Sequence, residues 1–510
     1  MKQLVSSSIA APGFYGLNTQ ESSVTLASGF ALQADNCVID SEGRLGARKG
    51  YVYQTTSGGT SSSIQGMFDY IGVTGHLDYI SWGNGNIYRG LGTLVPLTLP
   101  AGYVITANDW QATSLNGFVF LAQAGHFVLR IDSNYTVTVW DRHSPGHELP
   151  AVSWINTAFG RLFAGGEPAN KNILHISDNL NGDFHGGSSA TIDFNKIWTN
   201  GGDAIVAARG FNGNLIVFCK RCIVVLSDSN TTDLLFNVSD IGGLRVTEIL
   251  DNVGCVSKDS IQVVGDDLYF LSNTGLRSLN RVIQEKSNPM SDLSVNVRDD
   301  LVKIINAYSN ENVTSIYSAT NAFYLLIFPS SKLVYCFDTR GRLENGGLRV
   351  TKWVDSPILS GISAVDGSLY LGQIDGIAKY TSYQDNGLSY YLAYRTNYFD
   401  FDQPTVNKVL KTVGVTVIGG SGQNFSIKVG TDYTDQPRSY NRSVKQSTSA
   451  EYDIAEYDVS EFSGGGLTDR IKVAVGGQGS VIQLGFEAYI NGDQLSIQKF
   501  DLYVKQGKTN

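Results

Sequence analysis

Between Leu77 and Tyr380 one pattern of apolar and polar positions occurs seven times. Each copy has three to five mostly apolar residues, a polar turn that often contains glycine, and a second apolar run. The β-branched and aromatic residues beside each turn predict a β-hairpin. The copies are LDYISWGNGNIYRG (from Leu77), LNGFVFLAQAGHFVLRID (from Leu115), FGRLFAGGEPANKNILHISD (from Phe159), FNGNLIVFCKRCIVVLSD (from Phe211), GDDLYFLSNTGLRSLN (from Gly265), TNAFYLLIFPSSKLVYCFD (from Thr320) and DGSLYLGQIDGIAKY (from Asp366).

The period of this pattern predicts the architecture. Successive copies start 38, 44, 52, 54, 55 and 46 residues apart, which is the length of a four-stranded propeller blade. We therefore predict an all-β fold with a central β-propeller over residues 64–384. Seven hairpins predict six or seven blades, because a terminal hairpin can belong to another domain.

Both flanks of the repeat differ from it. Residues 1–63 have few apolar alternations and end in a low-complexity loop, so we assign them to an N-terminal arm or platform segment. Residues 385–510 contain longer strands, several of which alternate as cleanly as Ile482-Gln483-Leu484-Gly485-Phe486-Glu487-Ala488. Alternation indicates one buried face and one solvent-exposed face, which predicts a C-terminal platform domain resembling a β-sandwich.

One segment inside the propeller, residues 289–307, has a helical period. It places Leu293, Val297, Leu301 and Ile304 at i, i+4, i+8 and i+11, on one face of a helix. Pro289 precedes the helical pattern, and Ser291 or Asp292 can cap it. This short helical insertion either packs against its own propeller or contacts a neighbouring subunit.

The composition and charge of the chain argue against several classes of function. The chain has 510 residues, of which 17% are charged, and 56 glycines against 11 prolines, as expected of a turn-rich β-protein. The net charge of −9 argues against ordinary nucleic-acid binding, which needs a basic surface. The sequence contains no run of 18 apolar residues, so it does not predict membrane insertion. The polar N-terminus does not resemble a secretory signal. Five scattered cysteines predict no disulfide framework and suit a reducing cytoplasm.

Sequence motifs for catalysis are weak. His143-Ser144-Pro145-Gly146-His147 favours a surface turn over a metal site. Cys219 and Cys222 flank a hairpin tip rather than open a helix, so they can at most form a crosslink, and we expect a structural role. The segment 177–184 only loosely resembles the Asp-box turn of propeller glycosidases. We expect no catalytic residue, no cofactor and no metal site, and we expect that the chain is not an enzyme.

The stretch from Ala11 to Tyr51 is the most distinctive. It opens with turn-forming Pro12-Gly13, continues through apolar Phe14, Tyr15 and Leu17, and ends in the glycine-flanked basic turn 43–50. One interpretation is a solvated hairpin tip. The other is a docking arm, because aromatic and arginine side chains dominate interface energetics. The predicted contacts with another subunit or with an adaptor are Pro12, Phe14, Tyr15, Leu17, Asn18, Arg44, Arg48 and Lys49.

This stretch resembles the N-terminus of the tail nozzle proteins of short-tailed bacteriophages (podoviruses), also called tail tubular protein B or tail hub proteins. The pattern PGF-x-G-L-N, A-x-N-C-V-I-D and G-R-L-x-x-R-x-G matches at Pro12, Gly13, Phe14, Gly16, Leu17, Asn18, Ala34, Asn36, Cys37, Val38, Ile39, Asp40, Gly43, Arg44, Leu45, Arg48 and Gly50. The last strand, around Ile497 to Lys505, also resembles that family.

The resemblance implies a structural protein of the virion tail that assembles in the host cytoplasm. Such proteins form a homo-oligomeric ring, typically of six subunits, below the adaptor and portal. The ring retains the double-stranded DNA genome and then conducts it without sequence-specific binding, and tail fibres or spikes attach to it or around it.

Two other classes compete with this expectation. A carbohydrate-binding or glycan-cleaving propeller would use Trp82, Trp110, Trp154 or Trp198 as stacking platforms, although core packing between blades is the more economical role for them. A cellular adaptor of the WD-repeat type would carry Trp-Asp and Gly-His signatures, which the sequence lacks.

Overall fold

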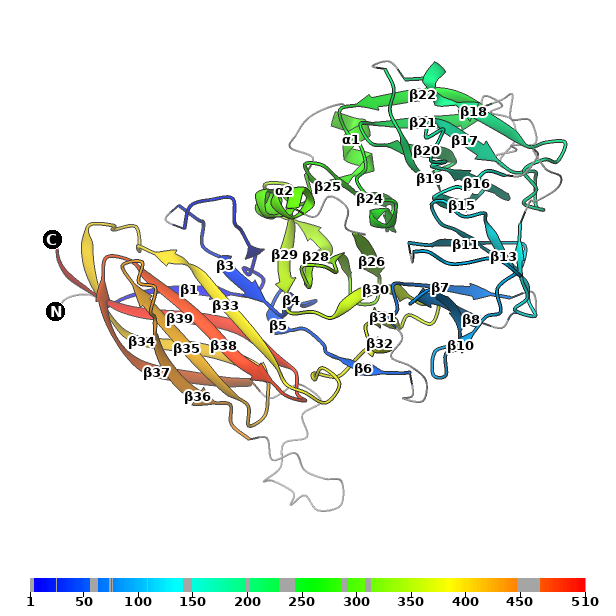
Figure 1. Ribbon diagram of the computed structural model, residues 1–510. Coiled ribbons are helices and arrows are strands. Elements are labelled where there is room, and N and C mark those ends of the chain that lie inside the picture. Colours follow the sequence, from blue (N-terminus) through cyan, green and yellow to red (C-terminus); the bar gives the residue numbers. More distant parts are fainter. Residues whose placement is uncertain are drawn as a thin grey trace.

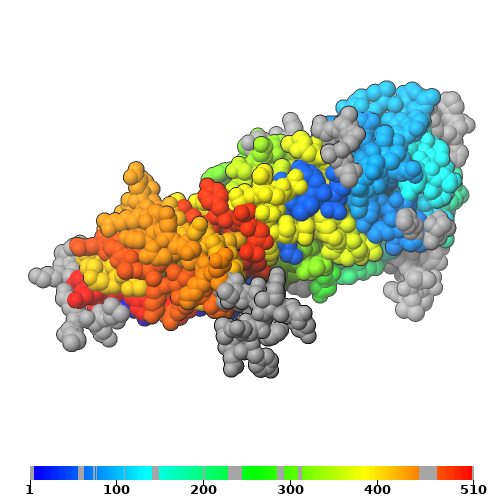
Figure 2. Space-filling view, turned by 90° about the horizontal axis from the view of Figure 1, so that it is seen from below, coloured from blue at the N-terminus to red at the C-terminus, as the bar shows by residue number. Residues whose placement is uncertain are grey.

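The computed structural model describes residues 4–23, 25–55, 63–72, 75, 77–107, 109–140, 149–198, 201–228, 244–285, 292–307, 313–446 and 468–509. The molecule is elongated, with a β-propeller at one end and a two-layered β-domain at the other (Figure 1). Figure 2 shows the same arrangement from below, with the C-terminal strands in orange and red far from the first blades in blue and cyan. Both chain ends lie at the far end of the two-layered domain.

Seven antiparallel sheets in the described residues form the blades of the propeller. The first four are β7 (Gly66–Ile71), β8 (Leu77–Gly83), β9 (Asn86–Arg89) and β10 (Val95–Pro96); β11 (Gln111–Leu115), β12 (Phe118–Ala122), β13 (Leu129–Ile131) and β14 (Val137–Val139); β15 (Trp154–Ala158), β16 (Arg161–Gly165), β17 (Ile173–Ile176) and β18 (Ala190–Asp193); and β19 (Ile205–Phe211), β20 (Asn214–Cys219), β21 (Cys222–Asp228) and β22 (Leu244–Asp251). The last three are β23 (Gln262–Val264), β24 (Asp267–Ser272) and β25 (Gly275–Ser278); β26 (Thr314–Ser318), β27 (Phe323–Phe328), β28 (Leu333–Arg342) and β29 (Leu348–Trp353); and β30 (Ile358–Ser363), β31 (Leu369–Gln373) and β32 (Gly376–Tyr380) with β6 (Tyr51–Tyr53).

The seven predicted hairpins are confirmed, and each forms the second and third strands of one blade. The described residues therefore form seven blades. The seventh blade takes its outer strand, β6, from the N-terminal segment. This pairing joins residues that are more than 320 positions apart. The ring of blades closes where β30 of the last blade packs beside β7 of the first. The predicted boundary at residue 63 is thus wrong, since the segment before it completes the propeller.

The fifth blade has three strands in the described residues and continues into helix α1 (Leu279–Glu285). A short 3-10 turn (Val295–Val297) and helix α2 (Arg298–Ala307) follow. The predicted helix is therefore shorter than expected. The helix buries Leu301 and Ile305, with Ile304 only partly buried, and Leu293 and Val297 are buried just before it. These side chains pack into the core of their own chain, which supports the first of the two interpretations of this insertion.

The two-layered domain is a β-sandwich that both ends of the chain build. One layer has the order β37-β34-β39-β5-β4, with β1 also paired to β39; the other continues blade six, in the order β29-β2-β3-β33-β38-β35-β36. The strands are β1 (Leu4–Ala10), β2 (Gly16–Leu17), β3 (Phe30–Asp35), β4 (Cys37–Ile39), β5 (Leu45–Ala47), β33 (Tyr390–Phe399), β34 (Val406–Gly419), β35 (Asn424–Thr431), β36 (Arg438–Ser443), β37 (Thr468–Gly479), β38 (Ile482–Ile490) and β39 (Leu495–Thr509).

The sandwich core explains the alternation seen in the sequence. In β38 the side chains of Ile482, Leu484 and Phe486 are fully buried between the layers. The opposite positions are less exposed than alternation predicts, because Gln483 is 8% exposed and donates a hydrogen bond to the carbonyl of Thr396. The same apolar core extends through the N-terminal segment to α2 and to blades five and six.

Candidate functional site

The N-terminal segment, predicted to be a docking arm, is the joint between the propeller and the sandwich. Strand β2 lies in parallel between β29 of blade six and β3 of the sandwich. Gly16 permits this approach: its φ is +81°, and a Cβ there would lie 2.3 Å from the carbonyl oxygen of Val350. Only glycine tolerates both the left-handed backbone and the contact.

Phe14 is fully buried in the joint and not exposed. Its ring meets the rings of Tyr394 and Phe500 edge-on, with both centroids 6.1 Å away. Leu17 and Asn18 are each 1% exposed, and the Asn18 side-chain oxygen accepts hydrogen bonds from the next turn, at Gln20 and Glu21. The prediction that Phe14, Leu17 and Asn18 contact a partner is wrong, because their side chains are used within the chain.

Arg48 is the polar centre of the same joint. Its guanidinium donates to both carboxylate oxygens of Asp385, at 2.9 and 2.8 Å, and Nε donates to Asn36 at 3.1 Å. The group lies over the rings of Tyr390 (4.1 Å) and Trp353 (5.7 Å), as in a cation–π contact. Burial lowers the pKa of Arg48, but the hydrogen bonds and charge of Asp385 outweigh it, so the pKa lies above its ordinary value. The predicted partner contact at Arg48 is therefore wrong as well.

Four predicted contact residues remain at the surface. Pro12 and Lys49 are exposed, and Tyr15 and Arg44 are half-buried. Arg44 is already paired with Asp40 at 2.6 Å and with Glu42 at 3.0 Å. The basic turn is thus largely neutralised within the chain, and contact of these four residues with a partner stays a prediction.

A groove on the outer face of the sandwich was not predicted from the sequence. Tyr391 of β33 and Tyr489 of β38 are direct cross-strand partners, with ring centroids 5.2 Å apart and exposures of 37% and 66%. They border a hollow of about 680 Å³, which is lined by Tyr391, Asn424, Phe425, Ser426, Asn441, Arg442, Ser443, Glu487, Ala488 and Tyr489. Their exposed positions in alternating strands were the signal, since the neighbouring Tyr390 and Ile490 are buried.

The groove lies next to an edge of the sheet. Strand β36 pairs only with β35 in the described residues, and most of its side chains are exposed. An edge strand presents unpaired backbone groups to an incoming chain. Within the groove wall, Glu487 is held by Lys428 at 3.0 Å and Arg395 at 3.7 Å. The surface combines two exposed aromatic side chains, a charge cluster and a strand that ends the sheet in the described residues.

The centre of the propeller holds a polar cavity of about 300 Å³, lined by the inner strands of several blades. Lys258 forms an ion pair with Asp109 at 3.0 Å and donates to the carbonyl of Ser153 at 2.9 Å. Burial raises the pKa of Asp259 to about 6, partly opposed by the charge of Lys258. A cavity of this size cannot admit a DNA duplex, which is roughly 20 Å wide.

The tryptophans proposed as glycan-stacking platforms are mostly core residues. Trp82, Trp110 and Trp154 are 5%, 3% and 1% exposed and belong to clusters between blades. Trp198 is partly buried against one of these clusters. Core packing is thus confirmed for the first three. The two histidines of the 143–147 turn lie outside the described residues.

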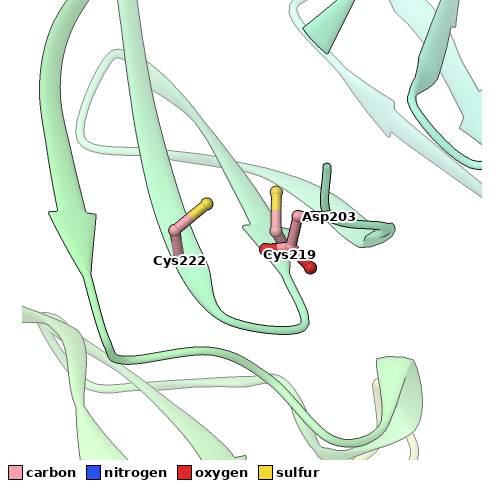
Figure 3. Close-up of side chains that lie close together, drawn as sticks. All are labelled: Asp203, Cys219 and Cys222. Carbon is pink, nitrogen blue, oxygen red and sulfur yellow. The ribbon is translucent and has the colours of Figure 1, made fainter. Parts of the chain in front are cut away.

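Two cysteines and a carboxylate come together at the tip of blade four (Figure 3). Cys219 is the last residue of β20 and Cys222 is the first residue of β21, so they flank the turn of this hairpin. Asp203 lies beside them. The side-chain interaction with Cys222, burial and the nearby Asp203 charge raise the pKa of the Cys219 thiol far above its usual range.

Comparison with known proteins does not assign the chain to a family. The chain matches no protein-family model and no curated protein. Among solved structures it is similar to the WD40 β-propeller domain of Doa1 (11% identity, TM-score 0.37, covering 65% of this chain and 96% of that chain) and to YCF48 bound to D1 peptide (12%, 0.37, 69% and 97%). A streptogramin B lyase gives 11% identity and a TM-score of 0.28, with 74% and 97% covered. Values this low carry no argument about function, so the propeller assignment follows from the strand pairing. No helix in the described residues is long and apolar enough to cross a membrane.

Proposed function

We propose that this chain is a structural, non-catalytic subunit of a podovirus tail. In this role it forms a homo-oligomeric ring, a hexameric nozzle, that binds the adaptor above it and retains and then conducts the double-stranded DNA genome. Its place is the virion tail after assembly in the host cytoplasm, with tail fibres or spikes as further partners.

The main support for the proposal is the structural role of the residues that match the nozzle pattern. Phe14, Gly16, Leu17, Asn36 and Arg48 match the nozzle pattern, and they build the joint that fixes the propeller on the sandwich. A continuous ten-stranded sheet runs from blade six through β2 and β3 into the sandwich. A rigid subunit suits a ring, because flexing at the joint would spoil closure of the ring.

The groove beside Tyr391 and Tyr489 supplies one subunit contact in this proposal. Aromatic side chains are enriched in the centres of interfaces and supply much of their binding energy. A closed ring joins two different faces of each subunit, so the groove would receive a complementary surface of the neighbouring copy. The surface residues Pro12, Tyr15, Arg44 and Lys49 are then available for the adaptor.

The acidic charge fits passage of DNA. A net charge of −9 leaves few cations to bind phosphates, and each such contact would slow a moving duplex. The propeller cavity is too small for DNA, so the proposed conduit is the space enclosed by the ring.

The test is the solution mass of the full-length chain by light scattering, with negative-stain images of the same peak, alone and with the adaptor protein. A ring of about six copies, with a pore of roughly 20 Å or more, supports the proposal. A discrete dimer or trimer without a pore, or a chain that stays monomeric with the adaptor, contradicts it. Stabilisation of such a species by oligosaccharides would instead favour a carbohydrate-binding or glycan-cleaving propeller.

A further inference from the structure

The hairpin tip of blade four brings three potential metal ligands together. The Sγ atoms of Cys219 and Cys222 and a carboxylate oxygen of Asp203 all lie within 4.8 Å of one another. In Figure 3 the sulfur of Cys222 points across the hairpin toward Cys219, and Asp203 stands on the far side of Cys219. Ligands on a tetrahedral zinc ion lie about 3.8 Å apart, given zinc–sulfur bonds of about 2.3 Å. Small side-chain rotations would therefore bring all three onto one ion.

The backbone holds the three residues in place. The Asp203 carboxylate accepts from the amide of Arg221, in the hairpin turn, at 2.9 Å and from the amide of Ala204 at 2.8 Å. The amide of Lys220 donates to the Ala204 carbonyl at 3.0 Å, which ties the turn to the loop that carries Asp203. Each carboxylate oxygen keeps a lone pair for a further ligand. Such outer hydrogen bonds orient the ligands of metal sites.

The cluster is protected but reachable. Cys219 is fully buried and Cys222 is 6% exposed. A small pocket of about 70 Å³ opens beside them, lined by Trp198, Gly201, Asp203, Arg221, Cys222, Asp251 and Asn252. A water molecule occupies about 30 Å³, so the pocket has room for a fourth, water ligand. Asp251 supplies a second carboxylate at its wall.

We propose that Cys219, Cys222 and Asp203 bind a thiophilic divalent cation of the zinc class. Soft thiolates select such ions over magnesium or calcium, and two thiolates with one carboxylate and one water complete a tetrahedral site. On binding, two sulfur–metal bonds form and the two thiol protons pass to solvent. The ion would staple the tip of the β20–β21 hairpin to the loop before β19. A disulfide between the cysteines would leave no role for the carboxylate.

The experiment is a Co²⁺ titration of the full-length chain, freed of metal by a chelator and kept reduced with a phosphine. The expected result is a thiolate-to-cobalt charge-transfer band that saturates at one ion per chain and disappears when Zn²⁺ is added. Cys219→Ser and Cys222→Ser should abolish the band, and Asp203→Asn should weaken binding at least tenfold. Cys255→Ser is the matched control, because Cys255 is an equally buried free thiol outside the cluster, and it should leave the band unchanged.

A second measurement separates loss of the site from loss of the fold. Zn²⁺ should raise the Tm of the wild-type chain and a chelator should reverse the rise, because a ligand that binds only the folded state stabilises it. The Tm of Cys222→Ser should not respond. No band with the wild-type chain, an equal band in Cys219→Ser, or a Tm that ignores Zn²⁺ would overturn the proposal.

Discussion

The propeller and the sandwich bury their apolar residues in different ways. The propeller divides most of its interior into separate clusters between neighbouring blades. The sandwich shares one continuous core with the N-terminal segment, helix α2 and blades five and six. The strands of each blade follow one another in sequence, except for β6 in the last blade, whereas the large core joins Ile9 near one chain end to Val504 near the other. The propeller is therefore modular, and the joint and sandwich form a single unit that needs both chain ends.

Phe14→Ala should have the largest effect. Removing a fully buried phenylalanine ring costs about 3–5 kcal/mol of unfolding free energy, and Phe14 lies where the N-terminal segment meets the core. Urea unfolding measures the loss, and hydrogen exchange should show lower protection in both β33 and β39. Leu388→Ala is the control, because Leu388 is 71% exposed. A cost below about 1 kcal/mol for Phe14→Ala would contradict the single-unit description.

Asp385→Ala should rank next. The substitution leaves the Arg48 charge buried without its partner, which costs about 3 kcal/mol or more. The double variant Arg48→Met with Asp385→Ala should recover much of that loss, because it removes both charges. The check is a double-mutant cycle in urea. Equal losses in the single and double variants would show that the ion pair itself, and not the unpaired charge, sets the cost.

Acid should weaken the propeller locally, through His175 of blade three. Burial lowers the pKa of His175 to about 4, with the nearby His185 adding to the shift. The unfolded chain takes up a proton below its ordinary pKa of about 6.5, and the folded chain resists it, so stability falls as pH drops from about 6.5 toward 4. The loss is at most about 3 kcal/mol, and the Glu167 carboxylate 4.0 Å away reduces it. Urea unfolding from pH 7 to pH 4 should show a shallower dependence for His175→Asn; an unchanged slope would contradict the assignment.

Tyr489→Ser should change stability least and assembly most. The ring is 66% exposed, so the unfolding free energy should move by no more than about 0.5 kcal/mol. Under the proposed function, light scattering should show loss of the ring. Val104→Ser, at an equally exposed apolar position on the propeller, should assemble normally. A Tyr489→Ser ring of wild-type mass would exclude this groove as a subunit contact.

The repeat pattern predicted more of the propeller than of its surroundings. Hairpin turns depend on residues that are adjacent in the chain, so the seven hairpins and their spacing could be predicted locally. The outer strand of the last blade could not, because Tyr51–Tyr53 pair with residues 378–380 and carry no local sign of that partner. The helix ends also shifted, since tertiary packing buries Ile305 in place of Ile304.

The same distinction between local and distant contacts applies to the candidate functional site. The unusual residues of the N-terminal segment can be recognised without a structure, because glycines, aromatics and arginines stand out in composition and spacing. That Phe14 and Arg48 face inward depends on the folded chain, since their partners Tyr394, Phe500 and Asp385 are more than 330 residues away. An aromatic ring or an arginine suits a core and an interface equally well, and the difference is which surface removes it from water.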